Sequence, residues 1–216
     1  MMEFKFKIQP FQAEAAKAVT DVFEGQPNQG AFAYVRDLGK RGATNLFDTA
    51  EGYGNAPMLL DAEQLLANIR SAQSGNQIME SSSLCADIGT CQLDVEMETG
   101  TGKTYAYTKT AYELNRLYGW TKFIVVVPSV AIREGVYKSF QATEQHFFEQ
   151  YGKPIKYFIY NSSRLNELDA YSQSTDINVM IINMQAFNTS MKEGGTSKEA
   201  RIMYSERDEF GSRRPI

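Results

Sequence analysis

The fold is decided by residues 92–127, which read QLDVEMETGTGKTYAYTKTAYELNRLYGWTKFIVVV. Their pattern predicts a short strand at 92–97, a glycine-rich turn, a helix at 103–118 and a second strand at 122–127. The second strand is a nearly continuous apolar run, which is typical of a parallel strand buried on both faces. The stretch therefore predicts a strand–loop–helix–strand unit of an α/β protein.

The turn inside this unit has the composition of a phosphate-binding loop. Gly100 and Gly102 let backbone N–H groups curl around phosphate oxygens, because no Cβ lies in the way. The following helix adds unpaired N–H groups and the positive end of its dipole. We expect Lys103 to neutralise the β- and γ-phosphates and Thr104 to ligate Mg²⁺. The expected nucleotide-binding residues of this loop are Thr99, Gly100, Thr101, Gly102, Lys103 and Thr104.

Strands and helices continue to alternate after this unit. The sequence predicts helices at 130–149 and 163–172 and strands at 155–160 and 177–182. Repeated units of this length favour a doubly wound α/β fold, in which helices flank a mainly parallel sheet. We therefore expect residues 92–190 to form the core of the protein.

The N-terminal part, residues 1–91, is expected to pack on this core as a helical and loop-rich elaboration. Apolar residues at helical spacing predict helices at 10–24 and 58–73. Residues 25–57 are rich in glycine, asparagine and proline, which indicates a loop-rich insertion. Residues 191–216 are polar with mixed charge. We expect the chain to be truncated in this segment, before the last element of the core.

Composition excludes several classes of protein. Of the 216 residues, 43% are hydrophobic and 22% are charged, as is usual for a soluble globular protein. The longest apolar run, Phe123–Val127, is too short to cross a bilayer. The N-terminus has no signal-peptide pattern, so we expect a cytoplasmic protein without membrane contact. Because the net charge is −4, any contact with nucleic acid must come from a local patch or from residues outside this sequence.

Zinc chemistry is not expected from this sequence. The two cysteines, Cys85 and Cys91, are six residues apart, which fits neither a redox motif nor a zinc site. His146 is the single histidine of the chain. We therefore interpret both cysteines as buried or half-buried thiols.

The chain resembles the N-terminal part of the restriction (Res) subunit of type III restriction–modification enzymes, a branch of superfamily-two helicases. The most specific segments are VEMETGTGKTYAYTKTAYELNRLYGWTKFIVVVPSVAIREGVYKSF at 95–140 and INVMIINMQAF at 177–187. FQAEA at 11–15 also resembles the upstream glutamine motif of such helicases. The likeness runs from about residue 4 to 190. In that family the phosphate loop opens with Met or Ala in place of Gly, which accounts for Met97.

The resemblance implies a RecA-like domain that binds ATP and Mg²⁺ and acts on double-stranded DNA with a methyltransferase (Mod) subunit. It implies that Lys103 is the catalytic lysine of helicase motif I. It also implies that Gln12 recognises adenine, because an amide can both donate to and accept from the edge of the base. The implied contacts to the DNA backbone are Pro128, Ser129, Arg133 and Gln185.

Parts of the family's machinery are not found in this sequence. The acidic motif II is expected just beyond residue 216, and neither 123–127 nor 179–182 ends in a carboxylate that could hold Mg²⁺. The second motor domain and the nuclease domain of the family are also absent. Since two motor domains sandwich ATP, we expect this chain to bind Mg–ATP but to hydrolyse it slowly or not at all.

Alternatives to a DNA motor remain open at this point. A small-molecule kinase or another P-loop NTPase would use the same phosphate loop without DNA, although the sequence has no clear lid rich in Arg or Lys. A module that only binds nucleotide is a third reading. Residues 25–92 either contact the methyltransferase or cover the sheet, and the sequence does not choose between the two.

Overall fold

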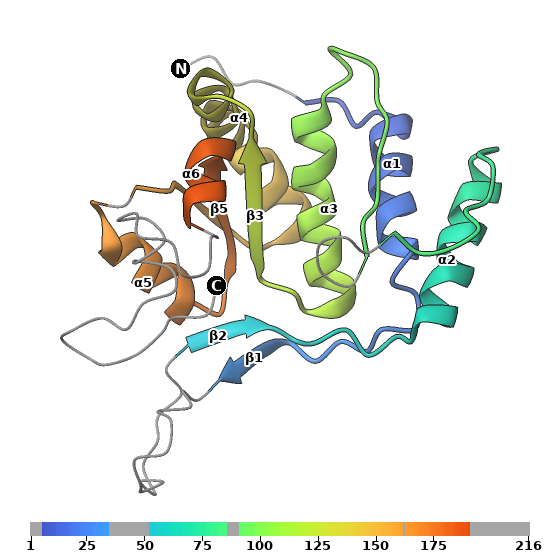
Figure 1. Ribbon diagram of the computed structural model, residues 1–216. Coiled ribbons are helices and arrows are strands. Elements are labelled where there is room, and N and C mark those ends of the chain that lie inside the picture. The colour runs from blue at the N-terminus through green and yellow to red at the C-terminus, as the bar shows by residue number, and fades with distance from the viewer. Residues whose placement is uncertain (1–5, 35–51, 86–90, 162, 191–216) are drawn as a thin grey trace, which may run out of the picture.

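The computed structural model describes residues 6–34, 52–85, 91–161 and 163–190 (Figure 1). The C-terminal segment 191–216 and part of the expected loop at 25–57 lie outside the described residues. The elements are α1 (Pro10–Asp21), β1 (Ala31–Tyr34), β2 (Gly52–Asn55), α2 (Ala62–Gly75), α3 (Lys103–Tyr118), β3 (Lys122–Val127), α4 (Val130–Tyr151), β4 (Ile155–Ile159), α5 (Leu165–Gln173), β5 (Ile177–Asn183) and α6 (Met184–Ser190).

A three-stranded parallel sheet forms the centre of the protein. The strands lie in the order β3-β5-β4, so β5 is the middle strand and pairs with both neighbours. Ile181 of β5, for example, lies between Val125 of β3 and Ile159 of β4. Because the strands are parallel and joined by helices, the prediction of an α/β, RecA-like fold is confirmed.

Helices cover both faces of this sheet. Alternate residues of a strand point to opposite faces, and in β5 Ile177, Val179 and Ile181 pack with side chains of α3 and α4. Met180 and Ile182 instead pack with side chains of α5 and α6. Residues 177–182 are at most 4% exposed. Burial on both faces explains why residues 179–182 of this strand are all apolar.

A polar network joins α3 to α4 beside the apolar core. The Tyr151 hydroxyl donates to Glu113 Oε1 at 2.7 Å and accepts from Lys109 Nζ at 2.8 Å. Arg116 pairs with Glu113 Oε2 at 2.7 Å. Burial acts to raise the pKa of Glu113, but the hydrogen bonds from Tyr151 and Arg116 and the charges of Arg116 and Lys109 outweigh it. The pKa of Glu113 is therefore lowered from its ordinary value of 4.5.

We expect Glu113 to contribute to stability at neutral pH and to lose that contribution in acid. A carboxyl group with a lowered pKa in the folded state stabilises fully above pH 4.5, and this stabilisation disappears as the pH falls through the lowered value. The difference in unfolding free energy between the parent and Glu113→Gln should therefore shrink with acidification, as measured by urea denaturation at several pH values. Glu149→Gln, which changes an exposed carboxylate of α4, is the control. An equal pH dependence for both variants would contradict the assignment.

The N-terminal elaboration packs on α3 and on the amino end of β3. α1 lies alongside α3 (Figure 1), and Val22, Phe23, Leu65 and Ile69 form a separate apolar cluster with Tyr118.

An antiparallel pair, β1 and β2, lies at the end of α3 where β3 begins (Figure 1). The Asn55 side chain of β2 accepts from the backbone N–H groups of Thr121 and Lys122, both at 2.8 Å, and donates to the Lys122 carbonyl. This part of the insertion therefore holds the turn between α3 and β3.

The predicted strand at 92–97 is wrong. This segment has no regular secondary structure, and Figure 1 shows it passing beside α1 and α3 before it reaches the start of α3. Its residues, QLDVEM, include two carboxylates, and Val95 is 50% exposed. A strand inside a parallel sheet needs apolar residues on both faces, and this segment supplies them on one face at most. The helix and strand predicted at 103–118 and 122–127, by contrast, are confirmed at the predicted bounds.

The loop-rich insertion expected at 25–57 also contains a short strand pair that was not predicted, because β1 and β2 lie within that range. Each strand has only four residues, and two of the four residues of β2 are glycine. Glycine is depleted in strands, so the composition gave no sign of this pair.

Candidate phosphate-binding and nucleic-acid site

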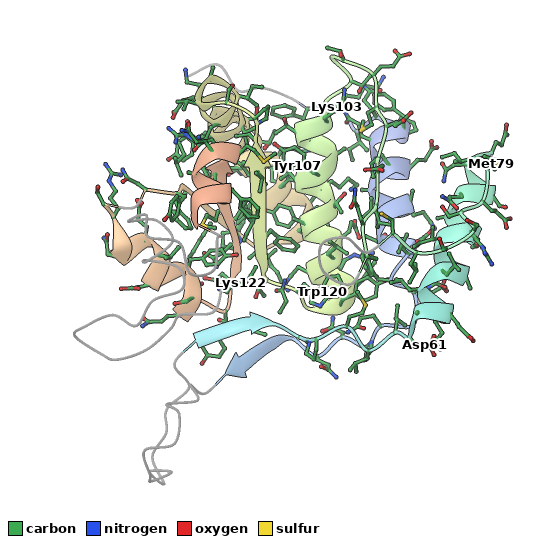
Figure 2. All side chains as sticks on the ribbon, viewed as in Figure 1. Asp61, Met79, Lys103, Tyr107, Trp120 and Lys122 are labelled. Atoms are coloured by element: carbon green, nitrogen blue, oxygen red, sulfur yellow. The ribbon has the colours of Figure 1, made fainter. Side chains whose placement is uncertain are left out.

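The candidate site lies at the carboxyl edge of the parallel sheet. β3 leads into α4 and β5 into α6 at this edge, and α3 begins at the same end of the molecule (Figure 1). Figure 2 shows Lys103 at this end of α3, with Trp120 and Lys122 near the opposite end. Open α/β sheets bind ligands outside the carboxyl ends of their strands. The fold therefore places the phosphate loop where such a sheet offers a ligand site.

The loop adopts a backbone conformation that requires glycine. Gly100 has φ of +84° and Gly102 has φ of +86°, in the left-handed region that L-residues with a side chain rarely enter. Gly102 is also the N-cap residue of α3, and no side chain caps this helix. α2 and α4, in contrast, are capped by Asp61 and Ser129. The first N–H groups of α3 are thus available to an anion, with the positive end of the helix dipole behind them.

Two polar side chains of the loop converge on the carbonyl oxygen of Glu98. Lys103 Nζ donates to it at 2.7 Å, and the Thr101 hydroxyl donates to it at 2.6 Å. Lys103 is exposed and Thr104 is half-buried at the first turn of α3. The lysine therefore lies over the loop that it follows, with its ammonium group on a backbone oxygen of that loop.

Gln12 contacts the loop directly, although it lies 89 residues away from Thr101 in the sequence. Its Nε2 donates to the Thr101 carbonyl at 2.8 Å, and the side chain is only 9% exposed. A Cβ added to Gly102 would lie 2.4 Å from the same Nε2 atom. The amide keeps a second N–H and its carbonyl oxygen for another partner. Sequence reasoning assigned Gln12 to the base and missed this contact with the loop, because the packing of α1 on α3 is not encoded in the glutamine motif itself.

The four residues expected to contact DNA lie where strands of the sheet lead into helices. Pro128 and Ser129 follow β3, Arg133 lies in the first turns of α4, and Gln185 is the second residue of α6. Ser129 also caps α4, since its hydroxyl accepts from the Ile132 N–H at 3.3 Å. Contact of these four residues with DNA stays a prediction.

Arg133 is more constrained than a typical surface arginine. One of its terminal nitrogens pairs with Glu134 at 3.0 Å, as the sequence allowed. Its side chain is only 20% exposed, and its Nε is buried without a hydrogen-bond partner among the described residues. The guanidinium is therefore held against Glu134 with one N–H group enclosed in the protein.

The carboxylate that would complete a magnesium site is not found at the strand ends that the structure describes. β3 ends at Val127, β4 at Ile159 and β5 at Asn183, and none of the three is followed directly by Asp or Glu. Across the described ranges, no group of three His, Cys, Asp or Glu side chains could hold a metal ion. The role of Thr104 as a ligand of Mg²⁺ stays a prediction.

The helices in the described part of the chain lack an apolar stretch of the length that a membrane span requires.

Comparison with known proteins agrees with the geometry of the site. The family described as "Type III restriction enzyme, res subunit" matches residues 5–210. The chain is 38% identical over 112 residues to the type III restriction-modification enzyme EcoPI Res subunit of Escherichia phage P1, and 34% identical over 112 residues to the EcoP15I Res subunit of Escherichia coli. Each alignment covers 51% of this chain but 11% of the relative. The StyLTI Res subunit of Salmonella typhimurium is 52% identical over 62 residues, which is 27% of this chain and 6% of that subunit.

Proposed function

Since this chain belongs to the type III restriction enzyme Res-subunit family, we propose that it is the first motor domain of an ATP-driven subunit that moves on double-stranded DNA. The observation that carries the proposal is the phosphate loop, whose two left-handed glycines lead into the uncapped N-terminus of α3 at the carboxyl edge of the sheet. This arrangement supports the binding of the β- and γ-phosphates of ATP.

Each residue of the loop has a separate task in this proposal. The backbone N–H groups of 99–104 surround the β-phosphate, and Lys103 leaves the Glu98 carbonyl to neutralise phosphate charge. Thr104 supplies its hydroxyl to Mg²⁺, whose role is to neutralise charge that develops on the phosphates. Gln12 keeps one N–H on Thr101 and uses the rest of its amide to recognise adenine.

ATP hydrolysis and DNA cleavage would require parts of the system outside the described residues. A carboxylate from motif II, a second motor domain and a nuclease domain would complete the enzyme. A methyltransferase (Mod) subunit would recognise the DNA sequence, while Pro128, Ser129, Arg133 and Gln185 would hold the DNA backbone. By itself, this chain is expected to bind Mg–ATP and to hydrolyse it slowly or not at all.

The test is a calorimetric titration of Mg–ATP into the parent chain and into Lys103→Ala. We expect the variant to bind about 10- to 100-fold more weakly, because it loses a charge-assisted interaction with the phosphates. Lys138→Ala, which removes an exposed lysine of α4, is the matched control and should bind like the parent. Weaker binding of GTP than of ATP would support the role of Gln12.

Three outcomes would contradict parts of the proposal. Equal affinity of the parent and Lys103→Ala would remove the phosphate loop from nucleotide binding. Sustained hydrolysis stimulated by double-stranded DNA would contradict the expected dependence on a second motor domain. Phosphate transfer from ATP to a small acceptor, without any effect of DNA, would favour the alternative of a small-molecule kinase.

A further inference from the structure

A groove of about 680 Å³ runs between α1, α2 and the segment that precedes the phosphate loop. Its walls include Ala15, Ala18 and Val19 of α1 and Ala72 of α2, with Leu93 on the third side. The three alanines have short side chains, so they leave the space between the two helices open. The volume is within the range of about 300–1,000 Å³ that is usual for ligand-binding clefts.

Apolar side chains at this groove remain in contact with solvent. Phe11 is 44% exposed, Ile78 is 58% exposed and Val95 is 50% exposed, and all three line the groove. Single exposed apolar residues are common on protein surfaces, but a concave group of them around a cleft marks an interaction site. The groove therefore offers apolar surface to a partner that can enter it.

The charged residues that line the groove are all acidic. They are Glu14, Asp94, Glu96 and Glu98, and no lysine or arginine belongs to the lining. No ion pair within the described part of the chain involves any of these four carboxylates. A negatively charged rim of this kind repels nucleic acid and attracts cationic side chains.

We propose that this groove docks an amphipathic, basic helical segment of a protein partner. Its apolar residues, spaced at i, i+3, i+4 and i+7, would enter between α1 and α2. Its lysine or arginine side chains would pair with the four carboxylates of the rim. The lining extends over residues 11–22 along α1 and 69–76 along α2, so the walls are roughly 12–18 Å long and match about 8–12 residues of a partner helix.

The groove shares residues with the phosphate loop, so docking would act on both. Glu98 and Thr101 line the groove, and the Glu98 carbonyl accepts from Lys103 Nζ and from the Thr101 hydroxyl. A partner that moves Glu98 would therefore change the position of Lys103. This link gives a protein partner a route to adjust nucleotide affinity, but the docking itself does not depend on the proposed function.

The experiment measures fluorescence anisotropy of a labelled 14-residue synthetic peptide of leucine and lysine in an amphipathic helical pattern. The parent chain should bind this peptide, and Glu96→Lys should weaken the binding by about tenfold or more, because attraction becomes repulsion. Glu149→Lys makes the same charge change on α4, away from the groove, and should stay within about twofold of the parent. Ala72→Trp should also weaken binding, because the larger side chain fills the groove.

Two further peptides decide whether the groove or bulk charge is responsible. One has the same composition with its leucines scrambled out of the helical pattern, and the other has glutamate in place of lysine. The proposal is supported if the patterned lysine peptide binds tightly and the two control peptides do not. Equal binding of the scrambled peptide, an equal effect of Glu96→Lys and Glu149→Lys, or no binding to the parent would overturn it. Because Glu96 is exposed on a segment without regular structure, the charge variants decide the question even if Ala72→Trp fails to fold.

Discussion

Replacing Phe147 by alanine is expected to lower the free energy of unfolding by about 3–5 kcal/mol. Phe147 lies on α4 and is fully buried against α3 and the sheet. Its ring lies 4.8 Å from the ring of Tyr105 and 5.2 Å from that of Tyr112, measured between centroids. Truncation removes these contacts and leaves a cavity that the closely packed rings around it cannot fill by small movements. Urea denaturation of the parent and the variant measures the difference.

The neighbouring residue provides the control for this prediction. Phe148 is the same residue type on the same helix, but it is 45% exposed. Phe148→Ala should therefore lower the unfolding free energy by much less than Phe147→Ala, while its effect on helix propensity is the same. Similar losses for the two variants would mean that α4 does not present its Phe147 face to the sheet.

Much of the parallel core could be predicted because its elements carry strong local signals. β3 and β5 each contain an apolar run, which ends at Pro128 after β3 and at Asn183 in β5, and α3 lies between the left-handed Gly102 and Gly119. Glycine at both ends of a helix marks its limits in the sequence itself. The predicted bounds of α3 and β3 are therefore confirmed to the residue.

The parts that could not be predicted depend on contacts between distant segments. The segment at 92–97 has a short alternating pattern that suits a strand locally, but it carries carboxylates and lies outside the sheet. The role of Asn55 is similar, since its bonds to Thr121 and Lys122 span more than 60 residues. Sequence patterns predict secondary structure from local periodicity. Contacts between distant segments leave no such periodic pattern, so they could not be predicted.

The contact between Gln12 and the phosphate loop leads to the second large prediction. We expect Gly102→Ala to lower the affinity for Mg–ATP by about 100-fold or more, because it combines two separate defects. The first is backbone strain, since φ at Gly102 is +86° and an alanine in this region costs about 1–2 kcal/mol. The second is the new Cβ, which would lie 2.4 Å from Gln12 Nε2 and displace the side chain that holds the Thr101 carbonyl.

Three further variants, Gly100→Ala, Gln12→Ala and the double variant of Gln12→Ala with Gly102→Ala, separate these defects in the same calorimetric titration. Gly100→Ala has the same kind of strain, with φ of +84°, but its Cβ would meet nothing within 4 Å, so it should lose less affinity than Gly102→Ala. In the double variant Gln12→Ala with Gly102→Ala, the new Cβ has no amide to displace. Its loss should therefore be smaller than the sum of the two single losses. Strictly additive losses, or equal losses for the two glycine variants, would show that Gln12 and the loop act independently, and the amide would then have no part in shaping the phosphate site.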